Sequence, residues 1–141
     1  MIEEYFKEYT KAFYDKNRAF KKYIDAKLDF YNITGTKYDD MPKGNRSIGF
    51  DDLLAHIEEL NEEYIRLYES YKQVRESCLK DIDKMDNPIH KSIIEYTYID
   101  FEKNKKIQCL LKEYFKVDYS YGHLMKMKAQ AIKEFVKVIK D

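Results

Sequence analysis

Apolar residues recur at helical spacing along most of this chain. The clearest pattern runs from residue 53 to residue 78, where apolar positions alternate at intervals of four and three and charged residues lie on the flanks. This heptad seam consists of Leu53, Ile57, Leu60, Tyr64, Leu67, Tyr71, Val74 and Cys78. It predicts a helix from about residue 50 to 84, roughly 50 Å long, which needs a partner along its whole seam.

A similar stripe precedes this helix. It predicts a first helix over 2–31, interrupted around Lys16 and Asn17 and ending near Gly35. The stripe consists of Ile2, Phe6, Tyr9, Phe13, Phe20, Ile24, Leu28 and Tyr31. Three of the four glycines and one proline fall in residues 35–49, so we expect a loop over 33–49 that lets the chain reverse. The seam then has two candidate partners: the first helix, folded back as an antiparallel coiled-coil hairpin, or a second copy of the chain.

Three shorter helices are predicted after residue 84. Asn87 is a good N-cap and Pro88 suits the first helical position, so a third helix should run to about Phe101. A fourth helix carries Ile107, Leu110, Leu111, Tyr114 and Phe115. A turn follows, and Ser120 caps a fifth helix that reaches about Ile139. The expected fold is therefore all-α, with a long helical hairpin over 1–84 and a three-helix bundle over 86–141.

Charge is unevenly distributed, although the chain as a whole is formally neutral. Residues 1–102 carry 16 basic and 22 acidic residues, a balance of −6, whereas residues 103–141 carry 10 and 4, a balance of +6. A local basic patch of this kind can attract phosphate. Two short helices joined by a tight turn, the second rich in lysine, match the outline of a helix-turn-helix.

On the fifth helix, Leu124, Met127, Ala131 and Phe135 share one stripe that can pack inward. The other faces offer groups that suit DNA: an amide for an adenine edge, and cations or hydroxyls for phosphates. We expect the DNA-binding residues to be Ser120, Tyr121, His123, Lys126, Lys128, Gln130 and Lys133. The alternative for these lysines is a solvent-exposed helix face that binds no partner.

Two stretches resemble a known family. They read "DNPIHKSIIEYTYID" and "KIQCLLKEYFKVDYSYGHLMKMKAQAIKEF", after a loop with "MPKG" and a long charged helix. In this order they resemble the ArpU/RinA-type transcriptional regulators of phages, most closely over "DYSYGHLMKMKAQAIKEF". There a Tyr-Ser pair is followed by apolar residues at Leu124 and Met127 and by the pair Ala131 and Ile132. The resemblance implies a coiled-coil N-terminal part and a C-terminal helix-turn-helix similar to region four of sigma factors. It also implies control of late or packaging genes through double-stranded DNA, with RNA polymerase as a candidate partner.

Other function classes lack their signatures. There is no glycine-rich phosphate loop, nucleophile elbow or cysteine-histidine pairing, so we expect no enzyme and no cofactor. Three scattered histidines and two cysteines 31 positions apart predict neither a metal site nor a disulfide framework. No apolar run approaches the roughly 20 residues that cross a membrane, and the cytoplasm of a bacterial host is the expected location.

A second function stays open beside DNA binding. The neutral total charge also fits an all-helical protein-interaction module, such as a phage-encoded inhibitor or adaptor of a host protein. Retention on DNA or heparin across a salt gradient separates the two hypotheses.

Overall fold

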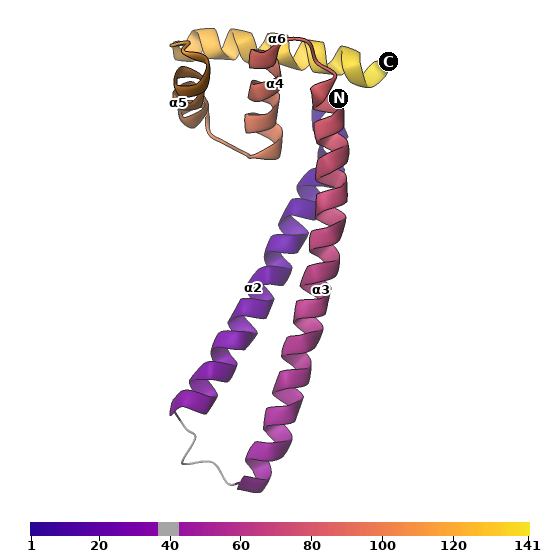
Figure 1. Cartoon of the computed structure of the whole chain (residues 1–141), viewed down its shortest axis with the longest axis vertical. Coiled ribbons are helices and arrows are strands. Elements are labelled where there is room, and N and C mark those ends of the chain that lie inside the picture. Colours follow the sequence, from indigo (N-terminus) through magenta and orange to yellow (C-terminus); the bar gives the residue numbers. More distant parts are fainter. Residues whose placement is uncertain (37–42) are drawn as a thin grey trace. The chain divides into compact units, whose positions relative to one another are not determined.

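A computed structural model describes the backbone of residues 1–36 and 43–141, and the side chains of residues 1–32 and 49–141. The elements, in order, are α1 (Ile2–Tyr5), α2 (Lys7–Thr36), α3 (Lys43–Asp83), α4 (Pro88–Ile94), a π-helical segment η1 (Glu95–Ile99), α5 (Asn104–Phe115) and α6 (Tyr121–Lys140) (Figure 1). The all-α class is confirmed, because the described residues contain no strand. Over the same residues, none of the helices combines the length and apolarity needed to cross a membrane.

The chain divides into two compact units within its long helices. Unit 1 consists of Met1–Tyr9 and Gln73–Asp141, and unit 2 consists of Thr10–Lys72. This division differs from the expected parts 1–84 and 86–141, since the first nine residues and the last turns of α3 pack with the C-terminal helices. Long-range aromatic contacts of the first residues, which helical periodicity does not reveal, account for the difference.

Aromatic rings from both ends of the chain form the core of unit 1. Phe6 stacks on Tyr98 and on Phe135, with ring centroids 5.0 and 5.5 Å away, and Tyr5 meets Phe135 edge-on at 5.1 Å. Stacked and edge-to-face pairs of this kind add to the free energy gained from burying the rings. Phe6 is 2% exposed and lies where α1 ends and α2 begins. The single helix expected over 2–31 is therefore broken at the residue that anchors it.

The segment after α4 departs from the α-helix expected up to Phe101. In η1 the Asp100 N–H donates to the Glu95 carbonyl, five residues back, over 3.0 Å. This segment supplies Tyr98 to the stack on Phe6. It also supplies the Ile99 carbonyl, which accepts a buried hydrogen bond of 2.7 Å from the Tyr9 hydroxyl. Two neighbouring residues of η1, Tyr98 and Ile99, thus contact the start of the chain.

A single carboxylate joins α6 to the start of α4. Glu134 Oε1 accepts hydrogen bonds from the backbone N–H groups of Asp86 (2.9 Å) and Asn87 (3.2 Å), while Oε2 lies 2.6 Å from Nδ1 of His90. Asn87 in turn caps α4, as expected, by accepting from the N–H groups of Ile89 and His90. Burial raises the pKa of Glu134, but the hydrogen bonds from His90, Asn87 and Asp86 outweigh it, and the pKa lies below its ordinary value.

In unit 2, ring pairs join α2 to α3. The Phe13 ring lies 6.2 Å from Tyr71, and the Phe20 ring lies 5.0 Å from Tyr64. Later residues of α2 thus contact earlier residues of α3, so the two helices run antiparallel. The seam residues in unit 2, from Leu53 to Tyr71, are buried or half-buried, whereas most of the α3 residues between them are exposed.

The stripe predicted for α2 is only partly buried in its second half, where Ile24 is half-buried and Phe20 meets Tyr64. Phe20, Leu28 and Tyr31 are 45%, 55% and 58% exposed, whereas Ala19 is buried. At Lys16, where the apolar pattern was interrupted, α2 continues, and the Lys16 ammonium lies over the rings of Phe13 (4.7 Å) and Tyr71 (4.6 Å).

The loop expected over 33–49 is also shorter at both ends. α2 extends to Thr36 and α3 begins at Lys43, while residues 37–42 lie outside the described part. One glycine costs a helix only about 1 kcal/mol relative to alanine, so Gly35, Gly44 and Gly49 do not by themselves end these helices.

Removing the Glu134 carboxylate should destabilise unit 1. We expect Glu134→Ala to lower the free energy of unfolding by about 2–3 kcal/mol, because two backbone donors and a buried imidazole lose their acceptor. Glu113→Ala, at an exposed position of α5, should change it by less than about 0.5 kcal/mol. Urea denaturation followed by circular dichroism measures both.

Wild type and Glu134→Ala also test the lowered pKa of the Glu134 carboxyl. A carboxyl whose pKa is lowered by folding stabilises fully above its ordinary pKa of 4.5 and loses that effect as pH falls through the lower folded value. The difference in stability between wild type and Glu134→Ala should therefore narrow as pH falls from about 6 towards about 3. A constant difference would contradict the role assigned to the ionised carboxylate.

The buried hydroxyl of Tyr9 gives a second test. Tyr9→Phe leaves the Ile99 carbonyl without its donor and should cost about 1–2 kcal/mol of unfolding free energy. Tyr121→Phe removes a hydroxyl from a side chain that is 61% exposed and should cost less than about 0.5 kcal/mol. Equal effects of the two substitutions would contradict the importance of the bond to η1.

Candidate nucleic-acid interface

α5 and α6 are joined by a short, well-capped turn. α5 ends at Lys116, whose φ of 59° is the left-handed conformation common at helix C-termini. Ser120 caps α6 as expected, its hydroxyl accepting from the His123 N–H over 3.2 Å. The Gln108 side chain donates to the Tyr119 carbonyl over 3.0 Å and holds the turn against α5. The connection is therefore fixed at both ends by hydrogen bonds or backbone geometry.

The inner side of α6 packs on the other helices of unit 1. Leu124, Ala131 and Phe135 are each 0% exposed, in agreement with the expected inward stripe, and Met127 is partly buried. α6 contacts both α4 and α5, and it lies across them in Figure 1. Tyr114, at the end of α5, is 66% exposed and takes no part in this core.

The opposite side of α6 carries lysines. At about 100° per residue, Lys126, Gln130 and Lys133 fall within about 60° of one another and face away from the buried stripe. Lys137 and Lys140 lie on the same side and widen the arc to about 80°; they were not among the expected residues, although their spacing of four and seven from Lys133 signals them. We call these five exposed residues, Lys126, Gln130, Lys133, Lys137 and Lys140, the basic face of α6.

The basic face is free of carboxylates from its own helix. Glu134 is the one acidic residue between Tyr121 and Lys140. Its side chain is turned towards the start of α4, where it accepts the three hydrogen bonds described above. Like charges therefore accumulate on the outer side of α6, where they attract an anionic partner.

Two other expected DNA-binding residues lie away from the basic face. Lys128 is partly buried and donates from Nζ to Asn104 Oδ1 at the start of α5 over 2.9 Å, and burial lowers the pKa of its ammonium. Tyr121 is 61% exposed but lies about 140° around the helix from Lys126.

The remaining two, Ser120 and His123, form the first turn of α6. The Ser120 hydroxyl is used in capping, while the exposed His123 ring lies 4.4 Å from the Tyr119 ring. Free backbone N–H groups of such a first turn favour an anion.

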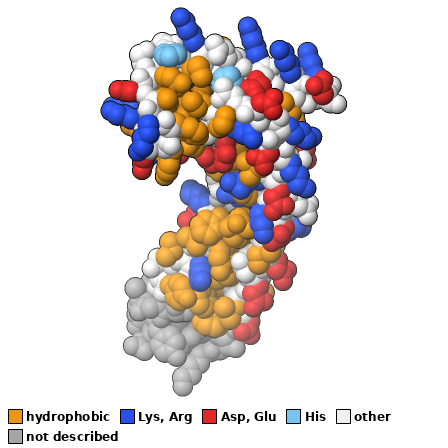
Figure 2. Space-filling model, turned by 45° about the horizontal axis from the view of Figure 1, so that its top comes forward, with side chains coloured by type: hydrophobic (Ala, Val, Ile, Leu, Met, Phe, Trp, Pro, Cys, Tyr) orange, Lys and Arg blue, Asp and Glu red, His pale blue; other side chains and the backbone are white. Residues whose placement is uncertain are grey.

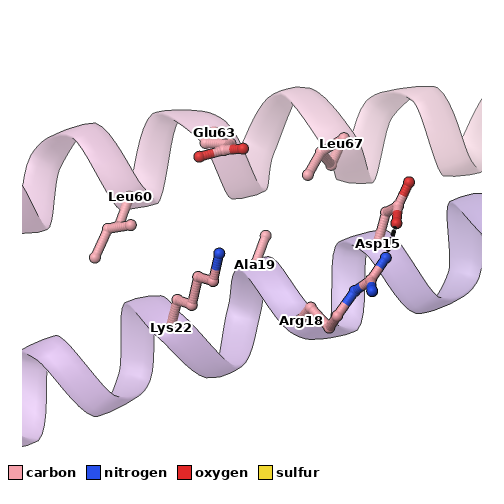
Figure 3. Close-up of a pocket in the computed structure, with 7 residues that line it drawn as sticks. All are labelled: Asp15, Arg18, Ala19, Lys22, Leu60, Glu63 and Leu67. Carbon is pink, nitrogen blue, oxygen red and sulfur yellow. Dashed lines mark hydrogen bonds and ion pairs between the residues drawn. The ribbon is translucent and has the colours of Figure 1, made fainter.

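Outside α6, an open groove of about 290 Å³ lies in unit 1 beside Tyr5, Cys78 and Asp81, and another of about 310 Å³ lies in unit 2 (Figure 3). The lining of the groove in unit 2 combines apolar residues with charges of both signs, and Arg18 is already paired with Asp15. The lining residues are Asp15, Arg18, Ala19, Lys22, Leu60, Glu63 and Leu67. Among the described side chains, no three His, Cys, Asp or Glu residues gather closely enough to hold a metal ion. The basic face of α6 is therefore the better-defined candidate site.

Comparison with known proteins identifies no family for this chain, so the choice of candidate site rests on the geometry above. Neither protein-family models nor searches among curated proteins and solved structures return a match to this chain.

Proposed function

We propose that this chain is a DNA-binding transcription regulator of the phage or prophage type, in which α5, the turn and α6 act as a helix-turn-helix. The observation that carries the proposal is the basic face of α6, from which the one carboxylate of the helix is turned away. A helix that presents lysines on one side and packs on a helical bundle with the other suits the major groove.

In this proposal the residues of the basic face divide into two roles. Lys126, Lys133, Lys137 and Lys140 neutralise phosphates, and Gln130 pairs with the N6 and N7 edge of an adenine. These residues extend over about 21 Å of helix, whereas the major groove is about 12 Å wide. The part of the helix that carries Gln130 therefore lies in the groove, and the lysines towards its ends reach the phosphate backbone on either side.

The resemblance to ArpU/RinA-type regulators supports the same function and adds its setting. It suggests a bacterial host cytoplasm, RNA polymerase as a candidate partner, and a non-enzymatic role with no cofactor. The ring pairs between α2 and α3 are compatible with the coiled-coil hairpin that the resemblance implies for the N-terminal part.

A second candidate function is a protein-interaction module without DNA binding. Its support is the number of large apolar side chains that unit 2 exposes, seven among the described residues. The two functions make opposite predictions for duplex DNA, so one titration separates them.

The deciding measurement is a fluorescence-anisotropy titration of the full chain against a pool of short duplexes at about 50 and 200 mM salt. DNA binding through lysines should weaken steeply between these conditions, because phosphate contacts release counterions. Absence of binding at the lower salt concentration would contradict the proposal and favour the interaction module.

Single lysine variants assign the phosphate contacts. Lys126→Ala and Lys133→Ala should each weaken binding to all duplexes and reduce the slope of log affinity against log salt by about one. Lys128→Ala is the matched control on the same helix, and it should leave the slope unchanged because its ammonium is bonded to Asn104. Equal slopes for all three variants would contradict the assigned face.

Gln130 should govern sequence preference and leave general affinity nearly intact. Gln130→Ala should cost about 1–3 kcal/mol at the preferred site and little on unrelated DNA. Selection of preferred duplexes from a random pool, before and after the substitution, measures this. Recovery of the same site with the same preference would remove Gln130 from base reading.

A further inference from the structure

Unit 2 exposes more apolar surface than its two helices can cover. Of the described side chains in Thr10–Lys72, only Ala19 and Ile57 are buried apolar residues, at 7% and 9% exposure. Seven large apolar side chains of the same unit are between 37% and 58% exposed. They are Tyr14, Phe20, Leu28, Tyr31, Leu54, Ile65 and Tyr68, and we call them the apolar face of unit 2.

These side chains lie on one side of the α2/α3 pair. At about 100° per residue, Tyr14, Phe20, Leu28 and Tyr31 fall within about 120° of one another on α2, and Leu54, Ile65 and Tyr68 fall within about 60° on α3. Ring contacts connect the two sets, from Phe20 through Tyr64 to Tyr68 at 5.0 and 6.0 Å. Figure 2 shows hydrophobic side chains gathered over this part of the chain. The groove of Figure 3, with its charged lining, opens on another side of the pair.

The heptad seam is not available to a second copy. Tyr64 and Tyr71, both seam residues, contact Phe20 and Phe13 of α2 within the same chain. A dimer through the seam, one of the two arrangements that the sequence left open, would have to displace these contacts. The apolar face lies beside the seam and needs no such displacement.

We propose that the apolar face of unit 2 binds the apolar face of a second copy of this chain, so that two α2/α3 pairs form a four-helix assembly. Seven side chains, each about half exposed and each worth about 150–250 Å² when aromatic, offer on the order of 600–700 Å² per copy. A standard protein interface buries about 800 Å² per partner. The apolar face thus matches the size of a self-complementary interface, and it is built from residues of the kind that anchor such interfaces.

Charge selects the arrangement of the two copies. Residues 10–32 of α2 carry six basic and three acidic side chains, and residues 49–72 of α3 carry two and seven. A two-fold axis along the helices places each α2 beside the α3 of the partner, so that opposite charges face each other across the interface. It also makes every neighbouring pair of helices antiparallel, as in an up-and-down four-helix bundle. A two-fold axis across the helices would instead place α2 beside α2 and α3 beside α3 of the partner, so that like charges face each other.

Molar mass measured by light scattering tests the dimer, using the full chain over about a hundredfold range of concentration. Wild type should show twice the chain mass of 17.1 kDa. Ile65→Lys, on the apolar face, should shift the midpoint of dissociation to at least about tenfold higher concentration. Ser70→Lys adds the same charge at an exposed α3 position about 140° away and should leave the midpoint unchanged.

Three outcomes would overturn the proposal: a monomer for wild type at all concentrations, an undisturbed Ile65→Lys dimer, or equal dissociation by both variants. Circular dichroism of the variants checks that the helices remain, since both positions are exposed. The outcome does not depend on DNA binding, which is measured separately.

Crosslinking tests the arrangement. A photo-reactive amino acid in place of Tyr31, in dimers mixed from isotopically labelled and unlabelled chains, should attach to residues 49–57 of the second copy. Attachment near residues 10–16 of α2 in the second copy would instead indicate an axis across the helices, because that axis places α2 beside α2 with the ends reversed, and would overturn the arrangement.

Discussion

The carboxylate of Glu134 is the interaction on which both the packing of unit 1 and its surface charge depend. It accepts the backbone donors just before α4 and the imidazole of His90, and so fixes where α4 starts and how it meets α6. Because this is the one acidic side chain of α6, the same contact leaves the outer side of that helix to lysines. A change that released Glu134 would therefore affect stability and the electrostatic field of the candidate interface together.

The features that the sequence predicted correctly depend on residues close together in the chain. Asn87 and Ser120 cap the helices they were expected to cap, and Leu124, Ala131 and Phe135 turn inward, since caps and helical stripes depend on residues a few positions apart. The contact between His90 and Glu134 joins residues 44 positions apart, and no periodicity reveals it.

The same limit explains the errors. Phe6 interrupts its helix because Tyr98 and Phe135 hold its ring, a contact that helical periodicity cannot show. Along α2, the predicted stripe includes Leu28 and Tyr31, which are exposed, and leaves out Ala19, which is buried. At the candidate site, helical spacing correctly placed Lys126, Gln130 and Lys133 outside the packed stripe, but the position of Lys128 depends on Asn104 of another helix.

The aromatic contacts of the first residues also bear on how the chain is made. Phe6 and Tyr9 are synthesised before the groups that hold them, because the Ile99 carbonyl that binds Tyr9 comes 90 positions later and Phe135 later still. At about 5–20 residues per second, these rings remain without their native partners for roughly 5–25 s of synthesis. Unit 1 therefore closes only after Phe135 has been synthesised, and until then the rings of Phe6 and Tyr9 form a hydrophobic segment that chaperones can bind and that other nascent chains can capture.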